Sequence, residues 1–256
     1  SGGSQTERLC FWLNCLNAGV LAALFEVEGP LPCSLGAWLD FLSHTWLDVQ
    51  GKEFSLLEIE HLVLRAQSSP PQIPPRGASP MAKRRQHRFP TKVDDDPRTP
   101  AFLVRPAREV SFGIALPICR GAPPLRVFRQ ELLDAQLQVN CAHLLAEGLQ
   151  IDAGRRRVVL PGLLAWYRAD FGSSDSALLE FIIGALRATA KAVEKLLDAA
   201  TPADLALPST ASRLAEELEV LRRPHGTSGV ESFPGVTVEP AELDWSFAVP
   251  RLQGAT

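Results

Sequence analysis

The chain has 256 residues, of which 46% are apolar and 21% are charged. This balance is typical of a globular protein with a large core and excludes a chain that is disordered throughout. The net charge of −3 gives no general attraction to nucleic acid or to anionic membranes, which would need a local basic patch. We therefore expect a protein partner rather than nucleic acid, and no insertion into a membrane.

The cysteines are odd in number and lack the paired spacing of a disulfide framework or a zinc site. They are Cys10, Cys15, Cys33, Cys119 and Cys141. We interpret them as reduced thiols of the core and expect an intracellular, cytoplasmic protein. The chain begins Ser-Gly-Gly-Ser without methionine, which is typical of an added linker or of the cut end of a longer protein.

The first predicted element is a central helix over residues 9–24, where large apolar residues recur at three- and four-residue steps. Asn14 and Asn17 interrupt this run. It falls short of the roughly 20 clean apolar residues of a membrane span, so we expect no transmembrane helix. Ser34 then predicts the start of a second helix, because serine is a favoured N-cap.

Two local signals follow. Residues 50–51, Gln-Gly, predict the turn of a short hairpin. Ser55 and Glu58 form the S-x-x-E pattern of a capping box, in which the serine side chain binds a backbone N–H and the glutamate reaches back to the serine N–H. We expect a helix to begin at Ser55.

A Pro-rich insertion over residues 67–108 excludes a continuous helix or a central strand. Its middle carries a basic run made of Lys83, Arg84, Arg85 and Arg88. The simplest interpretation is a solvated loop whose charge is balanced by the aspartates that follow. A partner-binding surface, or a nuclear-import or nucleic-acid patch, is the alternative, although no aromatic ladder supports nucleic acid.

Alternating large apolar residues over 110–118 predict a buried strand. Five further elements are expected, in chain order: a helix over 129–147, a hairpin joining 149–151 to 158–160, a helix from Pro161 to near Gly172, a helix over 174–198 and a helix over 212–223. The prediction is an α+β fold, mainly helical, packed around a small mixed or antiparallel sheet made of this strand and the two hairpins.

The expected organisation is one α+β domain over residues 1–200 that carries the insertion. Residues 201–256 are expected to form a C-terminal extension with one helix followed by an irregular tail that is rich in Gly and Pro.

Two early segments carry a family resemblance. Residues 54–65, FSLLEIEHLVLR, match the pattern F-x-L-x-x-I-E-H-x-I-L-R. Residues 11–18, FWLNCLNA, match F-W-x-N-x-Y-N-A, with Leu16 in place of the tyrosine. In these segments the chain resembles the domain of unknown function 547 family.

The resemblance extends over roughly residues 7–187 and is interrupted by the insertion. It continues through residues 112–128, 158–171 and 178–182. Cys119 lies about one residue out of register with the cysteine positions of relatives. The resemblance therefore does not carry thiol chemistry over to this residue.

The polar residues inside the apolar motifs have two interpretations. Asn14 and Asn17 lie three residues apart, so they share one face of the first helix and need hydrogen-bond partners if buried. His61 and Arg65 lie one helical turn apart, whereas Glu60 is expected to point about 100° away from His61. We favour a structural network over a polar pocket or a catalytic site. Its expected members are Asn14, Asn17, Glu60, His61, Arg65 and Arg126.

The catalytic alternative is a thiol-dependent hydrolase. Cys119, or else Cys15, would be its nucleophile, His61 its base and Asn17 the orienting group. The five histidines lie in separate segments without metal-ligand spacing, and no phosphate-binding glycine motif occurs, so we expect no metal and no cofactor.

Two function classes stay open on the sequence. The favoured one is a non-catalytic protein-interaction or scaffold domain, because the chain departs from the family at Leu16 and near Cys119 and carries a long charged insertion. The other is the thiol hydrolase. The oligomeric state is left open by the sequence.

Overall fold

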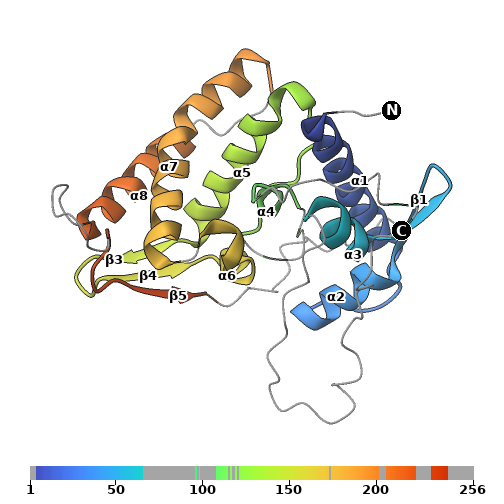
Figure 1. Ribbon diagram of the computed structural model, residues 1–256, viewed down its shortest axis with the longest axis horizontal. Helices are drawn as coiled ribbons and strands as arrows, with labels where there is room; N and C mark the ends of the chain where they lie inside the picture. Colours follow the sequence, from blue (N-terminus) through green and yellow to red (C-terminus); the bar gives the residue numbers. More distant parts are fainter. Residues whose placement is uncertain are drawn as a thin grey trace, which may run out of the picture. The chain divides into compact units, whose positions relative to one another are not determined.

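The computed structural model describes residues 4–65, 96, 98, 108–114, 116, 119, 121–172, 174–201, 206–222 and 232–241. The chain divides into two compact units, Ser1–Pro106 and Ala107–Thr256. Both are built mainly of helices, with a small antiparallel or mixed sheet in each, so the prediction of a mainly helical α+β fold is confirmed (Figure 1).

The described residues of the first unit form four helical segments and one hairpin. In chain order these are helices α1 (Gln5–Glu26) and α2 (Leu35–His44), strands β1 (Trp46–Val49) and β2 (Lys52–Ser55), helix α3 (Leu56–Glu58) and the π-helix η1 (Ile59–Leu64). The cap at Ser34 and the helix start at Ser55 are both confirmed, because each serine side chain accepts a backbone N–H of its helix.

Helix α1 is long and apolar enough, by length and composition, to cross a membrane. In the structure one face of this helix packs against α3 and η1, and three of its apolar side chains have no exposed surface. These are Leu13, Leu16 and Val20. Gly19 permits close contact, because a side chain there would meet Leu47 and Leu56 within 2.8 Å.

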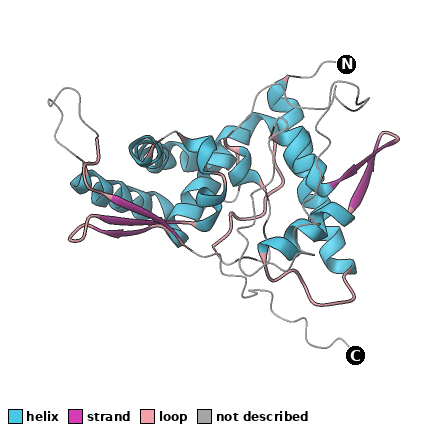
Figure 2. Ribbon diagram, turned by 60° about the horizontal axis from the view of Figure 1, so that its bottom comes forward, coloured by secondary structure: helices cyan, strands magenta, loops and turns pink. Residues whose placement is uncertain are grey.

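The hairpin β1–β2 extends away from the helices of its unit (Figure 2). Its turn has positive φ at Gln50 (56°) and Gly51 (76°), the backbone of a type I′ turn, whose twist matches that of paired strands. The side chain of Asp48 accepts the N–H of Gly51 at 2.7 Å and closes the turn. The predicted hairpin is confirmed.

The second unit places three long helices over a three-stranded sheet. Its elements are α4 (Val110–Gly113), η4 (Gln130–Leu132), α5 (Leu133–Gly148), β3 (Gln150–Asp152), β4 (Arg157–Leu160), α6 (Gly162–Trp166), η5 (Arg168–Phe171), α7 (Asp175–Asp198), α8 (Leu207–Leu221) and β5 (Thr237–Pro240). Helices α5, α7 and α8 contact one another, and the strands lie at one end of this group (Figure 1). Small residues of α5 and α7, such as Ala135, Ala142 and Ala192, allow the close packing.

The three-stranded sheet has a mixed topology. Strands β3 and β4 form the predicted antiparallel hairpin, and β5 adds to β4 in parallel, with Val158 opposite Val238. Arg156 fixes the approach of β5, because its guanidinium donates to the carbonyls of Leu221 (2.9 Å) and Pro234 (2.8 Å). Strand β5 lies within the tail that the sequence predicted to be irregular.

The prediction of a strand over residues 110–118 is wrong at its beginning. Residues 110–113 form the helical turn α4, in which the N–H of Ile114 binds the carbonyl of Val110 at 3.2 Å. Every residue from Val110 to Ile114 is buried. The small residues Ser111 and Gly113 alternate with large ones because they are packed closely, not because they face solvent. The two hairpins also belong to separate sheets.

Candidate functional site

The π-helix η1 brings three charged or polar side chains together inside the first unit. Glu60, His61 and Arg65 are all buried, with at most 3% of each exposed. Arg65 Nε donates to Glu60 Oε1 at 3.3 Å, and His61 Nε2 lies 3.6 Å from the same oxygen. The expectation that Glu60 points away from His61 is therefore wrong.

The π geometry explains this cluster. In an α-helix, residues five apart lie about 140° apart around the axis, and their side chains diverge. In η1 the N–H of Arg65 binds the carbonyl of Glu60 at 3.0 Å, which is the five-residue bond of a π-helix. That bond places Glu60 and Arg65 on one face, so that the carboxylate and the guanidinium meet.

The two asparagines of α1 differ in environment. Asn17 is buried with 3% exposed, whereas Asn14 is half-buried and its amide lies 3.9 Å from the sulfur of Cys10, one turn earlier. Both belong to the unit that contains His61. The network that joins them to His61 stays a prediction.

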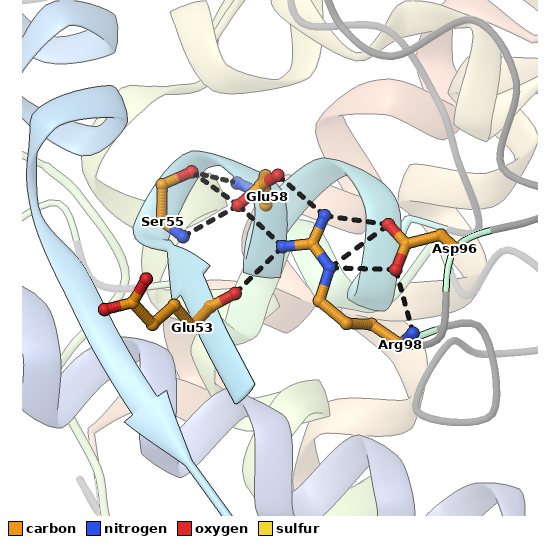
Figure 3. A network of polar contacts seen from close by, with 5 residues as sticks. All are labelled: Glu53, Ser55, Glu58, Asp96 and Arg98. Atoms are coloured by element: carbon orange, nitrogen blue, oxygen red, sulfur yellow. Dashed lines mark hydrogen bonds and ion pairs between the residues drawn. The ribbon is translucent and has the colours of Figure 1, made fainter. Parts of the chain in front are cut away.

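Arg98 is the centre of a polar network in the first unit (Figure 3). Its guanidinium donates to both carboxylate oxygens of Glu58 (2.9 and 3.1 Å), to Asp96 (2.8 Å) and to the carbonyl of Glu53 (2.9 Å). It also lies 5.0 Å from the centre of the Phe54 ring, a cation–π distance. Arg98, in the later part of the Pro-rich insertion, is thereby attached to the start of α3.

Glu58 has two structural roles at once. It completes the capping box by accepting the N–H of Ser55 at 2.9 Å, and it receives the fork of Arg98. A bidentate guanidinium–carboxylate pair is among the stronger hydrogen-bonded pairs in proteins. The guanidinium of Arg98, as donor to Asp96, is the largest cause of the lowered pKa of that carboxyl, and the two carboxylates raise the pKa of Arg98.

Replacement of Asp96 by Asn tests this network through pH. Since the folded pKa of Asp96 is lowered, its contribution to the free energy of unfolding is complete above the ordinary carboxyl pKa and is lost as the pH falls through the folded value. We expect Asp96→Asn to be destabilised by about 1 kcal/mol above pH ~5, a difference that shrinks below pH ~4. Urea unfolding of both proteins at several pH values measures it. A gap that stays constant down to pH ~2 would contradict the assignment.

Arg126 belongs to a second network, in the other unit. Its Nε donates to Oδ1 of Asn140 at 2.6 Å, and Nδ2 of Asn140 donates to the carbonyls of Phe112 (2.9 Å) and Pro124 (3.0 Å). Asn140 is 1% exposed. Burial lowers the pKa of Arg126. The amide of Asn140 thus ties two segments of the chain, the turn that contains Phe112 and the segment that contains Pro124 and Arg126, to α5.

Gln136, one turn before Asn140 on α5, continues this role. Its amide donates to the carbonyl of Val127 and accepts the N–H of Arg129, both at 2.9 Å. Gln136 and Asn140 together satisfy backbone groups of the extended segment 122–129, which has no strand partner among the described residues. The later part of the family-like segment 112–128 is therefore held by hydrogen bonds from a helix rather than by a sheet.

The second unit also contains a half-open cavity of about 610 Å³. Its apolar wall is an aromatic cluster in which the rings of Phe112, Phe171 and Phe181 lie 5.1 to 6.2 Å apart. Helices α5 and α7, together with residues 108 and 109 just before α4, supply the remaining lining, which includes Leu137, Cys141 and Gly184. A volume of this size is in the range of small-molecule sites.

Two of the thiols, Cys15 and Cys141, do not have the environment of a nucleophile. Burial raises the pKa of Cys15, and burial together with the charge of Glu109 raises the pKa of Cys141. A reactive cysteine requires the opposite shift. Cys119 is buried with 7% exposed, in the second unit, whereas His61 and Asn17 belong to the first. The catalytic group of Cys119, His61 and Asn17 stays a prediction.

Other predicted site residues lie elsewhere. Lys83, Arg84, Arg85 and Arg88 fall outside the described residues. Within the described part of the chain, no three side chains of His, Cys, Asp or Glu are grouped so as to hold a metal ion.

Sequence reasoning missed Arg98, Asn140 and Gln136. Arg98 is 40 residues from Glu58, and no local pattern connects them. Asn140 and Gln136 carried a usable signal, because two amides four residues apart share one face of a helix and need hydrogen-bond partners when buried.

The chain is thus a mainly helical α+β protein, and polar residues of its motif over residues 54–65 make contacts inside the core. The model of a family described as "Protein of unknown function, DUF547" matches residues 1–145, and the chain belongs to this family. Comparisons with curated proteins and with solved structures found no match.

Proposed function

We propose that the protein is a non-catalytic protein-interaction or scaffold domain. The observation that carries this proposal is the use of the polar residues in the family motif over residues 54–65. Glu58 caps α3 and binds Arg98, and Glu60 binds Arg65 inside the core. Side chains engaged in this way hold the fold and are not available to a substrate.

The thiols support the same proposal. An enzyme of the thiol class needs a thiolate near neutral pH, and the pKa values of Cys15 and Cys141 are shifted away from that state. Cys33 is the exposed cysteine among the described residues, at the entrance to α2.

Cysteine labelling of the native full chain tests the proposal against the hydrolase. We expect Cys33 to react fastest with iodoacetamide near pH 7, and the buried Cys10, Cys119 and Cys141 to react only as the protein unfolds. Mass spectrometry of the labelled peptides measures the four rates. Labelling of Cys119 ahead of Cys33, with a rate that falls in His61→Asn, would support the hydrolase instead.

The basic run of the insertion is the proposed partner-binding element. Reversal of its charges, by K83E, R84E, R85E and R88E together, is expected to remove specific partners from the full chain in quantitative proximity labelling. The matched control is reversal at four exposed helix positions of the second unit, R187E, K191E, K195E and R213E. Equal recovery of every partner by both variants would reject the run as the binding element.

A further inference from the structure

The cavity of the second unit has a charge pattern that selects a ligand. Four ionisable side chains line it besides Cys141: one guanidinium, Arg108, and three carboxylates, Glu109, Asp134 and Glu180. Two of these carboxylates already have cations. Arg108 Nε lies 3.2 Å from Glu109, and Arg222 lies 2.8 Å from Glu180.

Asp134 is the carboxylate that remains. It lies in the first turn of α5, is exposed, and has neither an ion pair nor a side-chain hydrogen bond with any residue that the structure describes. The lining therefore carries one negative charge that a bound cation would neutralise.

The aromatic wall shows which kind of cation fits. The guanidinium of Arg108 lies 5.0 Å from the centre of the Phe181 ring, so a planar cation is already accommodated against this wall. Phe181 is stacked parallel to Phe112, with 6° between the ring planes. An apolar body attached to the cation would contact these rings and Leu137.

Gly184 shows where such a body has room. A Cβ atom at this exposed glycine of α7 would meet no atom within 4 Å, although the residue lines the cavity. The space next to the Gly184 backbone is therefore open, and a side chain introduced at this position would begin in that space.

We propose that this cavity binds an organic cation in which a planar amidinium or guanidinium group is joined to an apolar body. The carboxylate of Asp134 accepts hydrogen bonds from the cationic group, and the phenylalanine wall contacts the apolar part of the ligand. The site lies beyond the interaction role proposed above and does not depend on the basic run of the insertion. The cation can belong to a free small molecule or to an arginine side chain of a partner protein.

Fluorine NMR titration of the full chain with 4-fluorobenzamidine, and with neutral 4-fluorobenzamide as its matched probe, tests the proposal. For a fragment of this size we expect a Kd of about 1 mM for the amidine and binding at least about 3-fold weaker for the amide. Equal binding of the two probes, or no binding of either, would overturn it.

Variants locate the site and give shifts of opposite sign. Gly184→Leu fills the space and is expected to weaken amidine binding at least about 10-fold, whereas Gly184→Ala serves as the small control. Asp134→Asn is expected to weaken it about 2- to 5-fold, and Asp198→Asn, an equal charge change near the end of α7, leaves it unchanged. Arg108→Gln removes the resident cation and is expected to tighten it about 2- to 5-fold.

The same titration identifies the source of the cation. The peptide acetyl-Gly-Arg-Gly-amide is added as a competitor of the amidine. If it competes and binds more tightly than the amidine, the cation is an arginine side chain of a partner protein. Weaker binding of this peptide indicates a free small molecule. If Gly184→Leu binds the amidine like the wild type while its melting temperature is unchanged, the cavity is not the site and the proposal fails.

Discussion

Replacement of Arg65 by Met is expected to lower the free energy of unfolding by about 3–5 kcal/mol. The substitution keeps most of the side-chain volume but removes the guanidinium that lies 3.3 Å from Glu60, and it leaves that carboxylate buried with 3% exposed. A buried charge that loses its partner is far more costly than an exposed one, because water cannot replace the interaction. Urea unfolding near pH 7 measures the loss.

Two further variants separate this effect from a general loss of arginine. Arg213→Met removes the exposed pair with Glu217 on α8 and is expected to change the stability by less than about 0.5 kcal/mol. The double variant Glu60→Leu with Arg65→Met removes both charges and is expected to recover part of the loss. A single Arg65→Met variant as stable as the wild type would show that the pair is not needed to hold η1.

Replacement of Asn140 by Ala is expected to cost about 2–4 kcal/mol in the second unit. It removes the donor to the carbonyls of Phe112 and Pro124 and the acceptor of Arg126, and all three contacts lie at or near the core. A buried carbonyl without a donor retains its desolvation cost, so the sum exceeds that of one ordinary hydrogen bond. Thermal and urea unfolding measure the change.

Asn140→Asp isolates the donor side of this contact. The carboxylate keeps an acceptor for Arg126 but places negative charge against the two carbonyls, so we expect a loss as large as that of Asn140→Ala despite the retained ion pair. Gln130→Ala, an amide truncation at an exposed position of η4, is the matched control and is expected to be nearly neutral. A stable Asn140→Asp variant would show that Arg126, rather than the carbonyls, makes this residue necessary.

The elements that the sequence predicted correctly are those with local signals. Ser34 and Ser55 act within one turn of their own helices, and the Gln50-Gly51 turn depends on the backbone of two residues. Such signals need no knowledge of the rest of the fold, because the atoms involved are close in the chain.

The errors and omissions arise where contacts with residues far away in the sequence determine the local structure. The sequence predicts a strand at α4 because large and small residues alternate there, as buried and exposed residues do in a strand. Strand β5 has only four residues, and its conformation depends on pairing with β4, which lies about 80 residues earlier. No local pattern in the sequence therefore predicts it. Glu60 was assigned the wrong direction because a π-helix was not expected after a capping box that is typical of an α-helix.

The same limits apply to the candidate site. The polar residues of the motif were recognised from their position in an apolar run, and the structure brings Glu60, His61 and Arg65 together. The partners Arg98 and Asn140 lie 40 and 14 residues from the groups that they bind. Only the tertiary fold places those groups within reach.

The π-helix makes the motif over residues 54–65 sensitive to its length. Glu60 and Arg65 are five residues apart, which is the hydrogen-bond spacing of a π-helix. Deletion of one residue between them would leave the four-residue spacing of an α-helix. Every side chain after the deletion would then project from a different face of the helix. A substitution at Leu62 or Val63 alters packing at one position, whereas an inserted or deleted residue alters the orientation of every later side chain in the segment. Sequences aligned with this protein should therefore be compared at this motif by the number of residues it contains before their identities are compared.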